Sequence, residues 1–349
     1  MNRDIFEELF VLEMANNHWG DVDRGLKIIN DYSRVVRFNN VRAAIKLQIR
    51  DVDSFIHKDF RDRQDIRYIK KTMEANLTRE GYVRLTEAIR KSSCLPMATP
   101  FDESSVDFCC ELGMQILKIA SSDINDWVLI EKIATTKKPV IISTGGSSLK
   151  DLDDLVLFFE RRNIPVAINH CVSLYPSDFL RKRYVGHTIG YSTHEHSSWS
   201  ASLFIAYAKG ARTFERHIDI DADGRSVSPY CSLPHQIDEW FKAFHKAKEM
   251  CGASGDIKRS PSRKEIEYLD GLVRGVYARH DLPAGHVLTD KDVYLAIPLQ
   301  KGQISCRELM SGEVILRPCP KDGPIMIDGI DSPYSHNDRL MQMIYKRGI

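Results

Sequence analysis

The sequence predicts an α/β protein: a (β/α)8 barrel followed by a small β-rich domain. Eight short apolar runs alternate with segments whose apolar residues recur at helical spacing, which is typical of a closed parallel barrel. The length of 349 residues fits one barrel of about 250 residues plus a small appendage. After about residue 271 the pattern changes to short strands and tight turns, so we expect the barrel to end before that point.

The predicted barrel elements follow one another with short connections. The expected strands are residues 10–14, 43–48, 95–101, 116–121, 139–146, 166–171, 186–194 and 213–217. The expected helices include residues 21–36, 78–91, 102–112, 127–135, 149–162, 198–209 and 234–250. Asp21 is a residue type that caps helix N-termini, which places the start of the first helix. The strongly charged stretch 58–71 indicates a surface excursion between the second and third strands.

Composition shifts divide the rest of the chain. Residues 252–263 are rich in Gly, Ser, Pro and charge, as linkers are. We therefore predict a barrel domain over residues 1–255, a linker over 256–271, a small β-rich domain over 272–330 and a polar tail over 331–349.

The overall charge excludes some classes of partner. Lys and Arg number 49 and Asp and Glu number 48, a balance that argues against a dedicated nucleic-acid surface. The chain has no run of eighteen apolar residues and its first residues are charged, so we expect a cytoplasmic protein with no membrane contact. The eight cysteines form no Cys-x-x-Cys pair and are expected to be reduced. A small-molecule ligand is the expected partner.

Two predicted strands end in histidine. His194 ends the seventh strand and His217 the eighth, with a helix between them. Because the carboxyl ends of neighbouring parallel strands lie side by side, the two imidazoles are expected to meet at the barrel mouth. A single histidine of this kind is more often structural, but the pair could share one divalent metal such as Mn, Fe, Co or Zn.

Polar side chains also end most of the other strands. They include Lys46 and Lys118, each within an otherwise apolar run. A lysine at a strand end often extends its ammonium to solvent, but two lysines and several hydroxyls converging on one rim favour an anion site.

These residues together resemble the sialic acid (N-acetylneuraminate) synthases, a family that includes relatives for spore-coat and surface polysaccharides. The shared motifs are EMANNHWG at 13–20, KLQ at 46–48, ATPF at 98–101, KIASSD at 118–123, STGG at 143–146, HCVSLYP at 170–176, GYSTH at 190–194 and ERH at 215–217. The stretch DLPAGHVLT at 281–289 is similar to the antifreeze-like (SAF) module that these enzymes carry.

The resemblance implies condensation of phosphoenolpyruvate with an N-acylated amino sugar of the N-acetylmannosamine type. It implies that His194 and His217 bind a divalent metal, Mn²⁺ above Mg²⁺ or Co²⁺. It gives catalytic roles to Glu13, Glu215 and Arg216. The substrate-binding residues it implies are Lys46, Gln48, Thr99, Phe101, Lys118, Ser121, Ser143, Ser173, Tyr175 and Ser192. It also implies a domain-swapped homodimer in which each small domain leans over the partner's barrel.

Three departures from the family pattern concern substrate recognition. Ser173 stands where the family commonly has Asn, residues 225–229 replace an acidic Pro-Gly-Pro-Asp stretch around Ser228, and Ile297 replaces an Arg in the small domain. The last two positions touch the acceptor in the family, so the acceptor sugar stays open.

Two other functions remain as alternatives. Lys46 or Lys118 could form a Schiff base in a barrel aldolase, because an inward lysine is the usual electrophile there. A barrel that has lost its acceptor groups could instead serve as a carbohydrate-binding subunit without activity.

Overall fold

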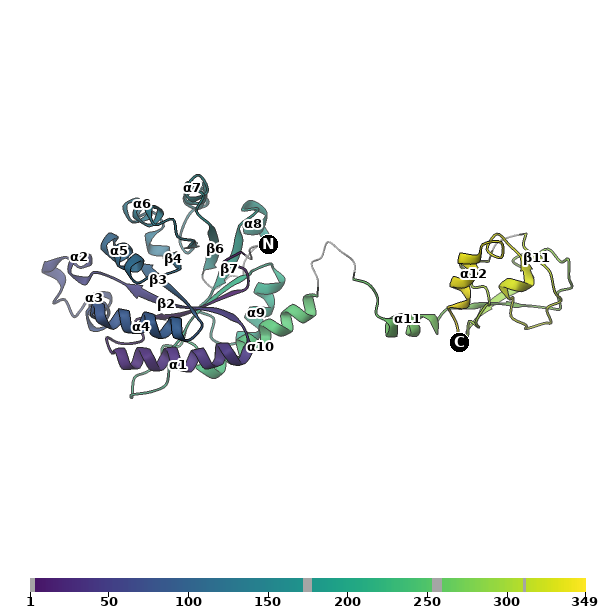
Figure 1. Ribbon diagram of the computed structural model, residues 1–349, viewed down its shortest axis with the longest axis horizontal. Helices are drawn as coiled ribbons and strands as arrows, with labels where there is room; N and C mark the ends of the chain where they lie inside the picture. Colours follow the sequence, from purple (N-terminus) through teal and green to yellow (C-terminus); the bar gives the residue numbers. More distant parts are fainter. Residues whose placement is uncertain (1–3, 172–177, 253–258, 310–311) are drawn as a thin grey trace. The chain divides into compact units, whose positions relative to one another are not determined.

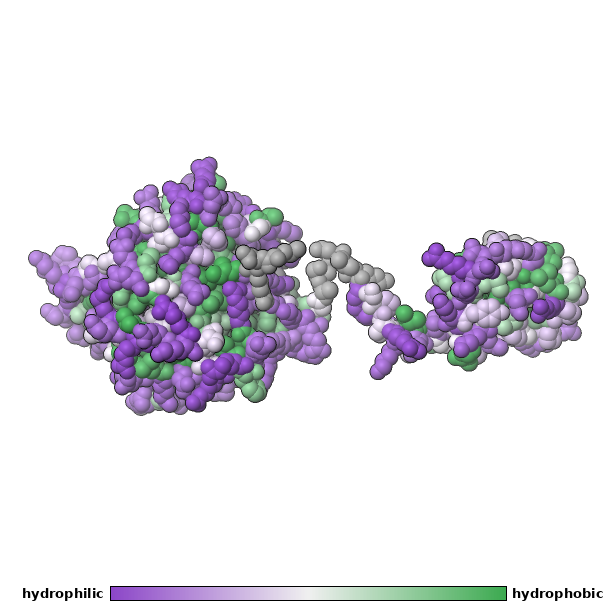
Figure 2. Space-filling model, viewed as in Figure 1, coloured by the Kyte–Doolittle hydropathy of each residue, from purple (hydrophilic) through white to green (hydrophobic). Residues whose placement is uncertain are grey.

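The computed structural model describes residues 4–171, 178–252, 259–309 and 312–349. The chain forms two compact units, Met1–Gly252 and Ala253–Ile349. None of the described helices is both long and apolar enough to cross a lipid bilayer. Hydrophilic residues cover most of the face seen in Figure 2, with smaller hydrophobic patches between them.

The first unit is the predicted closed barrel. Its eight parallel strands are hydrogen-bonded in sequence order, and β1 pairs with β8 to close the ring. The strands are β1 (Leu9–Ala15), β2 (Arg42–Ile49), β3 (Leu95–Pro100), β4 (Ile116–Ile119), β5 (Val140–Ser143), β6 (Val166–Cys171), β7 (Thr188–Ser192) and β8 (Thr213–His217). Figure 1 shows the helices arranged around these strands, which confirms the predicted fold class.

The helices of the barrel unit follow the strands as the apolar spacing predicts. They are α1 (Val22–Asn39), α2 (Val52–Phe55), α3 (Arg67–Glu74), α4 (Arg79–Lys91), α5 (Glu103–Glu111), α6 (Trp127–Thr135), α7 (Leu149–Glu160), α8 (Asp178–Arg183), α9 (Trp199–Ala208) and α10 (Pro234–Cys251), with 3₁₀ turns η1 (Lys58–Phe60) and η2 (Ser121–Asp123). The Asp21 side chain accepts hydrogen bonds from the first-turn N–H groups of α1, as predicted. The charged excursion between β2 and β3 contains α2, η1 and α3.

The alternation of side chains along each strand divides the barrel core into two layers. Leu9, Val11 and Ala44 belong to a small apolar cluster with residues of β3 to β6, which fills the barrel below the mouth. Phe10 has the opposite phase and packs edge-on against Trp240 and Phe241 of α10. Side chains in phase with the inner cluster but nearer the carboxyl ends therefore point into the mouth.

The second unit is small and rich in short strands. It contains α11 (Arg263–Asp270), β9 (Gly275–Ala278), β10 (Val293–Ala296), β11 (Val314–Ile315), η3 (Ile327–Gly329), β12 (Ile330–Asp331) and α12 (Asp338–Tyr345). β9 pairs with β10 and β11 with β12, both antiparallel. Helix α11 lies within the stretch that we expected to be a linker.

The expectation of a polar tail over residues 331–349 is wrong for its second half. α12 buries Ile344 in the apolar core of this unit, and Met341 packs against the same core. Both residues lie on one side of the helix at i and i+3, so the helix is amphipathic. Five of the eight residues of α12 are apolar, so the helix itself is not polar.

Candidate active site

A cavity of about 250 Å³ opens at the carboxyl ends of the barrel strands. Every predicted site residue that the structure describes lines it, except Arg216. The lining residues are Glu13, Lys46, Gln48, Thr99, Phe101, Lys118, Ala120, Ser121, Ser143, Cys171, Ser192, His194, Glu215 and His217. Ser173 and Tyr175 lie outside the described residues. Ala120 and Cys171 were not singled out in the sequence, because neither side chain marks a binding role by its type.

The floor of the cavity is a layer of buried, paired charges. The Lys46 ammonium forms ion pairs with Glu13 and with Glu215, 2.5 Å from the Glu215 Oε1, and Lys118 donates to the other Glu215 oxygen. Glu13 and Lys118 are only 1% and 2% exposed. A buried charge is tolerated only when it is paired, so these four residues depend on one another.

Burial and pairing act on these groups in opposite directions. Burial lowers the pKa of Lys46 to about 8, although the Glu215 carboxylate opposes that shift. Burial alone would raise the pKa of Glu215, but the charges of Lys118 and Lys46 outweigh it and hold that pKa well below its usual range. Glu215 is therefore an anion at neutral pH and keeps two cations at the base of the cavity.

Asn169 is a residue of this layer that the sequence analysis missed. Its Nδ2 donates to Glu215 Oε2 at 3.1 Å, and its side chain is fully buried. Its amide occupies the space beside Gly190 of β7, where an added Cβ would lie 1.9 Å from the Asn169 Oδ1. Position 190 therefore requires glycine for close approach. Asn169 could have been found from the alternation of side chains along β6: it lies two residues after Ala167, which points into the barrel, so its side chain must point inward as well.

Hydroxyl and amide groups surround the cavity above the charged layer. They come from five different strands or strand ends, namely Gln48, Thr99, Ser121, Ser143 and Ser192. Phosphate and carboxylate groups need several donors at once, and the two lysines below add positive charge. The arrangement suits a small anion with more than one acidic group.

The two predicted histidines meet at the mouth. The His194 and His217 rings lie 5.1 Å apart, and the Tyr230 ring lies 5.1 Å and 5.2 Å from them. The pKa of His217 is lowered to about 3, mainly by burial and to a lesser extent by the neighbouring His194. Burial also lowers the pKa of His194. Both imidazoles are neutral at pH 7, the form that binds metal.

The donor set fits a metal held by two protein ligands. Within residues 4–171, 178–252, 259–309 and 312–349, no group of three His, Cys, Asp or Glu side chains is placed to hold an ion. The buried Nδ1 of His217 has no hydrogen-bond partner among these residues. Water and substrate oxygens would have to complete the coordination of a metal bound to this pair.

Arg216, for which a catalytic role is expected, does not line the cavity. Arg216 has the outward phase of β8 and lies behind the cavity wall, where its guanidinium is 5.8 Å from the Trp240 ring. Its Nε donates to Ser232 Oγ at 2.9 Å and its Nη2 to the carbonyl of Glu195. Arg216 thus ties the segment after His194 to the segment after β8.

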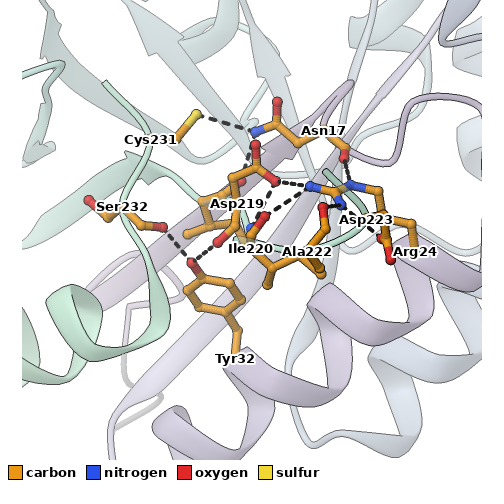
Figure 3. Close-up of polar contacts among 10 residues, drawn as sticks. Asn17, Arg24, Tyr32, Asp219, Ile220, Ala222, Asp223, Cys231 and Ser232 are labelled. Carbon is orange, nitrogen blue, oxygen red and sulfur yellow. Dashed lines mark hydrogen bonds and ion pairs between the residues drawn. The ribbon is translucent and has the colours of Figure 1, made fainter. Parts of the chain in front are cut away.

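Residues 218–232 follow β8 and form the β8 loop, both ends of which are tied to α1. Figure 3 shows Arg24 at the centre of these contacts. Arg24 Nη2 donates to Asp219 Oδ1 at 2.8 Å, and its other N–H groups reach the carbonyls of Asn17, Ile220 and Ala222 and the Asp223 carboxylate. Tyr32 donates to Asp219 O at 2.6 Å and also contacts the carbonyl of Ser232. Tyr230, near the end of this loop, is thereby held beside the histidines.

Arg24→Met is expected to lower the free energy of unfolding by roughly 3 kcal/mol. The change leaves the buried Asp219 carboxylate and several carbonyls without their donor. Denaturant unfolding measures the effect, with Arg34→Met on the exposed side of the same helix as the control. Equal stability of the two variants would contradict the structural role of Arg24.

The fold and the site together define a (β/α)8 barrel whose carboxyl-end face holds a cavity lined by two lysines, several hydroxyl groups and a histidine pair. Residues 40–256 match the NeuB family, and residues 273–331 match the SAF domain. The family match spans more than half of the chain, so the chain belongs to the NeuB family. This confirms the resemblance drawn from the motifs, including that of the small domain.

Solved structures and sequence relatives agree with this assignment. A structure described as spore coat polysaccharide biosynthesis protein E from Chromobacterium violaceum is 34% identical, covers 93% of this chain and 100% of its own, and has a TM-score of 0.85. The sialic acid synthetase of Leptospira borgpetersenii is 26% identical over 78% of this chain and 93% of its own, with a TM-score of 0.64. The N,N'-diacetyllegionaminic acid synthase of Campylobacter jejuni is 24% identical, covering 81% of this chain and 88% of its own.

Proposed function

We propose that this protein condenses phosphoenolpyruvate with an N-acylated amino sugar to give a sialic-acid-type 2-keto sugar acid and phosphate. The main observation in support is that one cavity contains both Lys46 and Lys118, each ion-paired with Glu215, and the His194–His217 pair. The relatives named as sialic and legionaminic acid synthases support this reaction class. The relative named for spore coat polysaccharide supports a role in surface polysaccharide synthesis.

The charged floor and the hydroxyls would bind phosphoenolpyruvate. Lys46 and Lys118 supply positive charge for its phosphate and carboxylate, while Thr99, Ser121 and Ser192 donate hydrogen bonds to their oxygens. In the condensation, C3 of the enol attacks the sugar aldehyde, C2 gains cationic character and takes up water, and phosphate leaves with cleavage of the C–O bond.

Glu13 would act on the developing charge at C2. Its carboxylate lies in the cavity floor against Lys46, and its Oε1 has no hydrogen-bond partner among the described residues. A buried carboxylate oxygen free of donors can stabilise a cation or accept a proton from the attacking water. Glu215 would act indirectly, by holding the ammonium groups of Lys46 and Lys118 in place through its ion pairs.

His194 and His217 would hold the divalent metal, with Mn²⁺ as our first expectation. When bound, the metal supplies Lewis acidity, worth several kcal/mol, for polarising the aldehyde oxygen. Arg216 and the contacts of the β8 loop keep the two imidazoles in place. A homodimer in which the small domain covers the partner's mouth is part of the proposal.

Phosphate release from phosphoenolpyruvate tests this function. We expect release by metal-stripped protein only after Mn²⁺ is added, and only with one class among a panel of N-acetylated hexosamines and their 6-phosphates. Release that is unchanged after chelation would refute the metal requirement. Borohydride trapping with pyruvate tests the aldolase alternative; we expect no adduct, since Lys46 and Lys118 are both ion-paired with carboxylates.

A further inference from the structure

The side-chain amide of Gln48 is held in one of its two orientations. Its Oε1 accepts a hydrogen bond from Arg50 Nη2 at 3.0 Å. A guanidinium only donates hydrogen bonds, so the amide cannot present its NH2 group to Arg50. The Nε2 of Gln48 has no acceptor among the described residues, and Gln48 lines the active-site cavity. The NH2 group is therefore the part of the amide that is left for a ligand in the cavity.

Arg50 is held in place by aromatic rings. Its side chain is buried, and its guanidinium carbon lies 3.6 Å from the centre of the Phe101 ring. The rings of Phe55 and Tyr68 each lie 5.7 Å away, and Arg50 Nη2 also donates to the Tyr68 hydroxyl at 2.9 Å. A guanidinium is attracted to the face of an aromatic ring, most strongly where water is excluded. These contacts fix the donor that faces Gln48.

Arg50 lies beside the active-site cavity without lining it. It comes directly after β2 and lines a neighbouring cavity of about 290 Å³. The charged group that faces it is Asp123: burial raises the pKa of the Asp123 carboxyl, and the charge of Arg50 opposes that shift. No carboxylate of the described residues is close enough to form an ion pair with Arg50. Its direct link to the active-site cavity is thus the hydrogen bond to Gln48.

We propose that Arg50 is a positioning residue that turns the NH2 group of Gln48 toward the anionic substrate. The inference rests on the proposed function and adds to it a residue outside the family motifs. An NH2 group attracts the oxygens of phosphoenolpyruvate, whereas an amide oxygen in the same place would repel them. The last torsion of glutamine is broad and roughly two-fold. Without Arg50 the amide can turn over and replace the donor by an acceptor.

A double-mutant cycle on phosphoenolpyruvate binding tests this role. Calorimetric titration of the full-length protein, with no acceptor sugar present, measures Kd for phosphoenolpyruvate. Arg50→Met and Gln48→Ala should each raise Kd about tenfold, as expected for loss of one hydrogen bond to a charged group. The double variant should bind no more weakly than Gln48→Ala, because Arg50 acts through Gln48. Effects that multiply to about a hundredfold would overturn the proposal, since they would show that Arg50 acts on the substrate by another route.

Two single variants complete the experiment. Arg50→Lys should keep most of the affinity, because an ammonium can also only donate to the Gln48 Oε1. Arg79→Met is the matched control and should bind as the unaltered protein does. Arg79 lines the same neighbouring cavity as Arg50, but its guanidinium is exposed and pairs with Glu111. Denaturant unfolding of each variant shows that it is folded.

The outcomes separate this role from the proposed function. The expected pattern of Kd values supports Arg50 as a positioning residue even if no acceptor sugar releases phosphate, in which case only the proposed function fails. An unchanged Kd in a folded Arg50→Met variant overturns the role of Arg50 and leaves the synthase proposal intact. Absence of binding by the unaltered protein would overturn both.

Discussion

Glu215→Gln should weaken phosphoenolpyruvate binding and move the activity optimum to lower pH. The Glu215 carboxylate raises the pKa of Lys46 against the effect of burial, and the balance is a pKa of about 8. Without the carboxylate this pKa falls further, so the ammonium that binds the substrate anion persists only at lower pH. At pH values near 8 we expect KM for phosphoenolpyruvate to rise about a hundredfold, as loss of a buried charge-assisted contact predicts.

The test is to measure KM for phosphoenolpyruvate between about pH 6 and about pH 9. This range includes the pKa of Lys46 and the lower value expected in the variant. Glu87→Gln, on the exposed side of α4, is the matched control and should behave as the wild type. A denaturation curve for Glu215→Gln shows whether the variant is folded at each pH. A folded variant with the wild-type pH profile would disprove the role given to Glu215.

His217→Ala should abolish metal-dependent phosphate release. His217 is one of only two protein ligands that we propose, and its buried Nδ1 has no other partner among the described residues. Loss of Lewis-acid assistance worth about 4 kcal/mol corresponds to a fall in kcat of roughly a thousandfold. Bound manganese, measured on dialysed protein by elemental analysis, should fall in parallel.

Two further variants complete this test. His194→Ala should show the same loss as His217→Ala, because the two rings lie 5.1 Å apart and would share one ion. His235→Ala, at the exposed start of α10, is the control and should keep both metal and activity. Full activity in His194→Ala or His217→Ala would remove the metal site from the proposal.

Much of the candidate site was predictable because strands alternate with a period of two. Lys46 and Gln48 share the inward phase of Ala44, and Glu13 shares that of Leu9 and Val11. In a parallel barrel the inward residues nearest the carboxyl ends must meet at one mouth. Residue type and phase were therefore enough to place these side chains in the same cavity.

Arg216 shows where that reasoning was incomplete. It lies between Glu215 and His217, both of which point inward, so the same period places its side chain on the outside. The family motif treats Glu215, Arg216 and His217 as one unit, whereas the alternation along β8 separates Arg216 from the other two. A positioning role follows from its bonds to Glu195 and Ser232.

The barrel, the SAF domain and the set of side chains at the mouth were predictable from the sequence, because they depend on local periodicity and on motifs. The pairing of those side chains was not predictable, because it depends on contacts between segments far apart in the chain. Lys46 and Glu215 are 169 residues apart, and their contact depends on closure of β1 against β8. The fit of Asn169 beside Gly190 and the approach of Lys71 and Arg225 to Trp19 likewise join distant segments. Such contacts depend on three-dimensional packing, which local sequence patterns do not encode.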